Sequence, residues 1–112
     1  MAREDRAVDD PTPEDCERGL AEARELAGKI LRGEGDALRL ADSIYWAGYL
    51  NGGFAGTADK PPCPELNDVA ATFVQFTAYI HVAQNKAEAT REAIAEIREA
   101  AQAFLEGRPL HS

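Results

Sequence analysis

The sequence predicts an all-α fold: a compact antiparallel four-helix domain with a disordered N-terminal arm. Four segments carry apolar residues at helical spacing, and short breaks rich in glycine or proline separate them. Short loops favour antiparallel neighbours. The length of 112 residues and an apolar fraction of 45% suit one globular domain. We expect an arm at 1–11, a helical domain at 12–107 and a tail at 108–112.

The first helix is expected from residue 13 to residue 32. Thr12 is a favourable N-cap, Pro13 suits the first helical position, and Glu14 and Asp15 favour the positive end of the helix dipole. The glycines at 33–35 end the helix. Its apolar face is formed by Leu20, Ala23, Ala27, Ile30 and Leu31.

The second helix is expected from residue 37 to residue 56, with Asp36 as its cap. Residues 41–55 are almost all apolar, which predicts the most buried helix of the domain. Asp42 would then need a partner, and Arg39 stands one turn before it.

Glycines recur in this segment, "WAGYLNGGFAG", where each costs a helix interior roughly 1 kcal/mol. Gly48, Gly52 and Gly56 stand four residues apart and would share one face. We expect Gly48 and Gly52 to form a bare ridge against another helix, from this chain or from a second copy. The alternative is that the helix ends near Asn51 and "NGG" is a turn. The spacing does not fit a dinucleotide-binding loop.

Four aromatic residues accompany these glycines: Tyr45, Trp46, Tyr49 and Phe54. Trp and Tyr dominate the energetics of protein interfaces, yet in small domains they also fill the core. Both interpretations stay open.

The third segment, residues 64–84, has helical spacing, but residues 72–82 also alternate as a strand would. We expect a helix, because the segment is long and the chain has no second strand-like run to pair with it. The fourth helix is expected from residue 85 to residue 107. Asn85 and Glu88 have the spacing of a capping box, and Gly107 and Pro109 end the helix.

Composition excludes several classes of function. The net charge of -8, without a basic cluster, argues against nucleic-acid binding. The sequence has no run of about 18 apolar residues, the length that a membrane span requires. Residues 1–10 hold no apolar signal segment. His81 and Ser43 belong to no catalytic motif, so we expect no enzyme, no metal and no cofactor, and we expect His81 to be a structural residue with satisfied hydrogen bonds.

Cys16 and Cys63 allow one disulfide. They stand at the starts of the first and third helices, which run the same way in an antiparallel bundle and therefore share one end. We expect the two residues to lie close enough to pair, although a reduced pair is the usual state of cysteines in the cytosol.

One pattern resembles a known family. "GYLNG", an aspartate, "CP" and two long helices with an Ala-rich end follow in the order found in the Rap1a/Tai family, and the matching positions are Gly48, Tyr49, Gly52, Asp59 and Cys63. The resemblance implies a small helical immunity protein, periplasmic and disulfide-bonded, that binds a type VI secreted effector, often as a dimer. It implies a periplasmic location if a leader has been removed; otherwise the chain is expected in the cytoplasm.

We therefore expect a protein that acts by stoichiometric binding of another protein, as an inhibitor or immunity protein. Two alternatives stay open. One is a scaffold subunit that self-assembles through the second helix, and the other is a phage-type antagonist of a bacterial defence enzyme. We expect the inhibitor or the antagonist to be a monomer or a homodimer, whereas a scaffold subunit should form larger assemblies alone.

Overall fold

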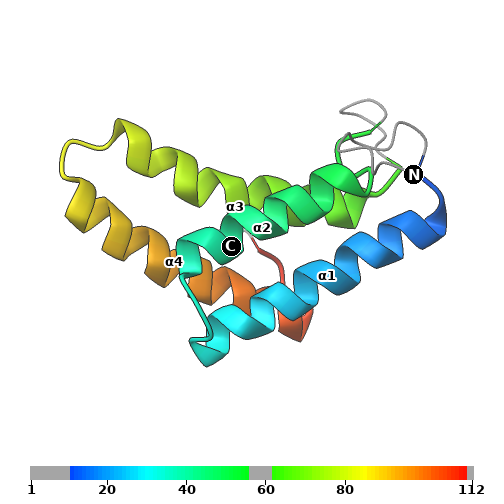
Figure 1. The fold of residues 1–112 in the computed structure, drawn as a ribbon, viewed down its shortest axis with the longest axis horizontal. Coiled ribbons are helices and arrows are strands. Elements are labelled where there is room, and N and C mark those ends of the chain that lie inside the picture. The colour runs from blue at the N-terminus through cyan, green and yellow to red at the C-terminus, as the bar shows by residue number, and fades with distance from the viewer. Residues whose placement is uncertain (1–10, 56–61, 111–112) are drawn as a thin grey trace, which may run out of the picture.

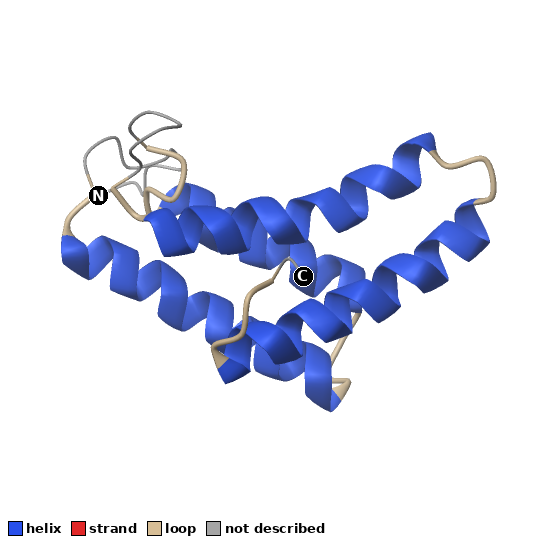
Figure 2. Ribbon diagram, turned by 180° about the vertical axis from the view of Figure 1, so that it is seen from behind, coloured by secondary structure: helices blue, strands red, loops and turns tan. Residues whose placement is uncertain are grey.

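The computed structural model describes residues 11–55 and 62–110. It contains four helices: α1 (Pro13–Arg32), α2 (Ala37–Leu50), α3 (Pro64–Val82) and α4 (Lys86–Glu106). Successive helices run in opposite directions, and the turn between α3 and α4 projects beyond α1 and α2 (Figure 1). All regular structure in the described ranges is helical, so residues 72–82 are helix rather than strand (Figure 2). The predicted fold class is confirmed.

The helices begin at the caps that the sequence predicts. The Thr12 hydroxyl accepts a hydrogen bond from the Asp15 N–H at 3.2 Å, and the Thr12 N–H donates to the Asp15 carboxylate at 2.9 Å. Asn85 caps α4 by accepting from the Glu88 N–H at 3.1 Å. These bonds satisfy amide groups that have no partner inside the helix, and so they fix where each helix starts.

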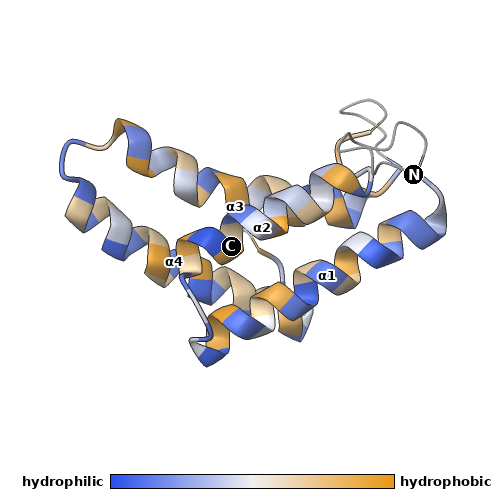
Figure 3. Cartoon of the chain, in the orientation of Figure 1, coloured by the Kyte–Doolittle hydropathy of each residue, from blue (hydrophilic) through white to orange (hydrophobic). Residues whose placement is uncertain are grey.

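The core lies where the apolar faces of all four helices meet, and polar residues cover the outer faces of α1 and α4 (Figure 3). Arg98 of α4 reaches across to α1 and donates to the carbonyl of Ile30 at 3.1 Å. This bond satisfies a carbonyl at the negative end of α1 and ties the two helices together. The largest fully buried side chains are Phe73, Ile30, Ile44, Leu66, Ile97 and Val69.

α2 ends at Leu50, earlier than expected, so the predicted helix to residue 56 is wrong. The Gly52 N–H donates to the Tyr49 carbonyl at 3.4 Å, and the Gly53 N–H donates to the Gly48 carbonyl at 2.7 Å. Gly52 has φ of 87°. These are the two bonds and the left-handed residue of a Schellman helix end. "NGG" is therefore the turn that we held as the alternative, and Gly52 is not part of a helical ridge.

Gly48 does mark a close approach between helices, which confirms the part of the ridge prediction that concerns this glycine. It is buried in α2, and a Cβ added to it would overlap the Cβ of Ala70 in α3. The same added atom would lie 3.7 Å from the Leu66 carbonyl oxygen. Two small residues thus bring α2 and α3 together at this point, and the approach can offset the helix-propensity cost of the glycine.

Cys16 and Cys63 form a disulfide with a Cα–Cα distance of 5.6 Å, which confirms the predicted proximity. The bond joins the start of α1 to the start of α3. Pro11, assigned to the arm, lies against Gly52, and Leu110, assigned to the tail, packs against the core. Residues 1–10 of the predicted arm lie outside the described part of the chain.

Candidate protein-binding surface

Four aromatic side chains gather at the surface of α2 and the turn that follows it. We call Tyr45, Trp46, Tyr49 and Phe54 the aromatic patch. Trp46 stands edge-on to Tyr45 and Tyr49, with ring centroids 5.4 and 5.5 Å apart. Phe54 lies 5.6 Å from Tyr45. These separations are typical of favourable ring pairs, so the patch is a connected cluster.

The patch is open to solvent, although α2 exposes a smaller share of its residues than the other three helices do, only Arg39, Asp42, Ser43 and Trp46 being exposed. Trp46 is 47% exposed and Phe54 is 39% exposed, while Tyr45 and Tyr49 are half-buried. α2 buries only small residues and Ile44 toward the core. An apolar run in sequence does not distinguish a helix surrounded by protein from one whose aromatic face is left uncovered.

The turn that carries Phe54 is held from two sides. Asn51 is buried, and its side-chain amide donates to the Ala47 carbonyl at 2.7 Å. Asn67 of α3 donates to the Gly53 carbonyl at 2.8 Å. The aromatic patch is therefore built on a helix and an anchored turn, which suits a rigid recognition surface.

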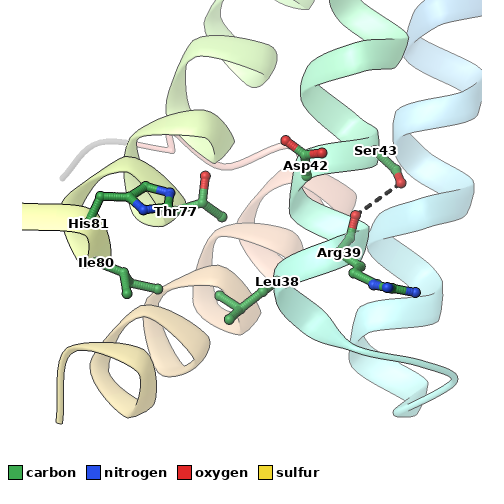
Figure 4. A pocket seen from close by; sticks show the side chains of 7 residues that line it. All are labelled: Leu38, Arg39, Asp42, Ser43, Thr77, Ile80 and His81. Carbon is green, nitrogen blue, oxygen red and sulfur yellow. Dashed lines mark hydrogen bonds between the residues drawn. The ribbon is translucent and has the colours of Figure 1, made fainter. Parts of the chain in front are cut away.

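A groove of about 560 Å³ opens between the first half of α2 and the last turns of α3. Leu38 and Ile80 face each other across it, and Asp42, Thr77 and His81 line its other side (Figure 4). The remaining lining residues are Arg39 and Ser43.

Two of these residues differ from expectation. His81 is exposed rather than a satisfied structural histidine. Asp42 is exposed too, and the structure shows no ion pair between it and Arg39, whose guanidinium points away from the groove (Figure 4). Ser43 donates its hydroxyl hydrogen bond to the Arg39 carbonyl at 3.0 Å, so it is not held as a nucleophile by a base.

The carboxyl groups whose pKa is shifted lie at helix ends rather than in the aromatic patch or the groove. Hydrogen bonds from the Thr12 backbone and hydroxyl, with Arg18 nearby, hold the pKa of Asp15 below its ordinary value. Hydrogen bonds from Gln102 and Arg108 lower the pKa of Glu106. Both shifts report capping and local pairing, not an acid tuned for proton transfer.

The other predicted site residues are placed as follows. Gly48 lies at the α2–α3 contact, Gly52 ends α2, and Asp59 lies outside the described residues. Within residues 11–55 and 62–110, no three metal-binding side chains come together. No helix in those ranges has the length and apolarity to span a bilayer.

Comparison with known proteins adds no relative: no family model, no curated protein and no solved structure matches the chain. The class of this protein is therefore defined by its own fold and surface rather than by a relative. It is a disulfide-linked, all-α four-helix domain that displays an aromatic patch on its second helix.

Proposed function

We propose that this protein acts by stoichiometric binding of another protein through the aromatic patch, and that it serves as an inhibitor or immunity protein. The observation that supports the proposal is the exposure of a connected ring cluster built around Trp46. Exposed apolar surface costs solubility, and clustered aromatic rings are typical of interface centres.

The rigidity of the patch favours binding. Rings have few rotatable bonds, and the Asn51 and Asn67 hydrogen bonds hold the turn at Phe54 before any partner arrives. Little conformational entropy is then lost on association. The inhibitor or immunity role rests on the resemblance to the Rap1a/Tai pattern, whose matching positions are Gly48, Tyr49, Gly52, Asp59 and Cys63. The disulfide also suits an oxidising compartment such as the periplasm.

Self-assembly through the same patch is the second candidate, because an exposed ring cluster serves a second copy as well as a foreign partner. The net charge of -8 favours the foreign partner, since like charge opposes association between copies of one chain. A phage-type antagonist would use the same acidity against a basic groove.

The test is affinity capture from the organism that encodes the protein, with three baits: wild type, Trp46→Ser and Leu105→Ser. Leu105 is a matched control because it is an exposed apolar residue, 41% accessible, on α4. Wild type and Leu105→Ser should retain one partner in fixed stoichiometry, while Trp46→Ser should lose it. Equal capture by the two variants, or large assemblies of the wild type alone, would contradict the proposal.

A further inference from the structure

The groove beside the patch follows from the close contact at Gly48. Gly48 lies against Ala70, and α2 and α3 run in opposite directions. Leu38, ten residues before Gly48, therefore comes to face Ile80, ten residues after Ala70. The two helices are in contact at the Gly48 end and diverge toward the other end (Figure 1). Divergence from a point of close contact leaves the groove of about 560 Å³. This volume is within the range of ligand sites.

The groove combines two apolar side chains with the carboxylate of Asp42. Leu38 of α2 and Ile80 of α3 face each other at one end of the groove, and the Asp42 carboxylate lies one helical turn further along α2, on the side where Thr77 of α3 lies (Figure 4). The Thr77 hydroxyl donates to the Val74 carbonyl at 3.0 Å. Within the described residues no ion pair joins this carboxylate to a cation, and the Arg39 guanidinium points away from it (Figure 4).

The backbone at this end favours positive charge as well. α3 ends beside the groove, and its last carbonyls carry the negative end of the helix dipole. The Lys86 ammonium group already donates to the carbonyls of Ile80 and His81, at 3.4 and 3.3 Å. The positive start of α2 lies nearby, but the Asp36 carboxylate caps it at 3.0 Å from the Leu38 N–H.

The groove is continuous with the aromatic patch along one face of α2. Positions 38, 42, 45 and 49 recur every three or four residues, so Leu38, Asp42, Tyr45 and Tyr49 share that face. At 1.5 Å per residue they span roughly 17 Å, or about three helical turns. A single helix laid along α2 would cover the rings at one end and the carboxylate at the other.

We propose that the groove receives a lysine or arginine from an amphipathic helix of the bound partner. The apolar face of that helix packs on Leu38, Ile80 and the aromatic patch, and its cation pairs with Asp42. This inference rests on the proposed function and adds the chemistry of the partner: a basic amphipathic helix.

The test uses defined peptides and isothermal titration calorimetry. One probe is a helical peptide of about 18 residues, five turns, with leucine on one face and lysine on the other. A matched peptide carries glutamate in place of lysine, and free butylamine supplies the ammonium group without a helix. The proteins are wild type, Asp42→Asn, Trp46→Ser and Glu25→Gln. Glu25 is the matched control because it is an exposed acid of α1 outside the groove.

The lysine peptide should bind, and Asp42→Asn should weaken it about tenfold, which equals roughly 1.4 kcal/mol. Glu25→Gln should change affinity by less than about twofold, because an exposed charge elsewhere contributes little. Trp46→Ser should also weaken binding.

Three outcomes would overturn the inference. They are equal binding of the glutamate peptide, equal effects of Asp42→Asn and Glu25→Gln, and binding of butylamine alone. If Trp46→Ser weakens the peptide but Asp42→Asn does not, the groove is excluded while the aromatic patch stands as the binding surface. Circular dichroism of each variant verifies that it is folded.

Discussion

Gly48→Ala should destabilise the domain, although alanine is the better helix former. The added methyl group would overlap the Cβ of Ala70, and its other near neighbours are backbone atoms of α3, at 3.7 Å. Backbone cannot rotate away as a side chain can, so α2 and α3 must move apart. The same movement would disturb the groove and the base of the aromatic patch.

The expected size follows from two opposing terms. Replacing a helical glycine by alanine stabilises by roughly 1 kcal/mol, whereas overpacking a tight contact costs about 1 to 3 kcal/mol. We expect a net loss of about 1 kcal/mol for Gly48→Ala, or a fall of roughly 5 °C in Tm. Gly28→Ala is the matched control. The atoms nearest to a Cβ at Gly28 belong to the guanidinium of Arg32, the far end of a long side chain that can shift, so this variant should gain up to about 1 kcal/mol.

Urea denaturation followed by circular dichroism, with the disulfide intact, measures both variants. The double variant Gly48→Ala with Ala70→Gly removes the overlapping methyl group from the other helix. It should recover part of the loss, which gives a coupling between the two sites. If Gly48→Ala stabilises the domain as much as Gly28→Ala does, the close contact between α2 and α3 is refuted.

Four further changes test the parts of the fold that support the surface. Cys16→Ser combined with Cys63→Ser should lower the free energy of unfolding by about 4 kcal/mol, because the bond closes a long loop; a urea midpoint unchanged under oxidising conditions would contradict this. Gly52→Ala should cost about 1 kcal/mol or more, since its φ of 87° disfavours any side chain, and a variant as stable as wild type would refute the assigned helix end. Thr12→Ala should cost about 1 kcal/mol in the same assay. The lowered pKa of Asp15 means that its stabilisation is present above its unfolded-state pKa near 3.9 and is lost as pH falls through the lower folded value. Wild type and Asp15→Asn should therefore converge in stability at acid pH, and a constant difference would show that the carboxylate is not involved.

Local signals in the sequence were enough to predict where the helices start and that the two cysteines lie close together. Thr12, Asp36 and Asn85 cap helices through bonds to residues two or three positions away, so sequence spacing reveals them. The cysteines were placed together because helices one and three of an antiparallel bundle start at the same end. The first inference needs only the spacing of residues along the chain, and the second needs only the order of the helices.

The candidate site depends on contacts that spacing does not show. Gly48 and Gly52 look equivalent in sequence, yet one faces Ala70 inside a helix and the other adopts a positive φ beyond its end. Whether Trp46 is covered depends on which other elements pack against its side of α2, which no local pattern encodes. The bond from Arg98 to the Ile30 carbonyl, 68 residues away, was missed for the same reason.

Trp46 offers the most direct test of binding through the aromatic patch, because it is the single tryptophan of the chain. Protein labelled with fluorotryptophan is titrated with the captured partner, and the fluorine NMR signal of Trp46 is followed. Binding through the patch should shift and broaden the signal, with the change complete at a fixed molar ratio. A complex that forms while the Trp46 signal keeps the shift of the free protein would contradict binding through the patch.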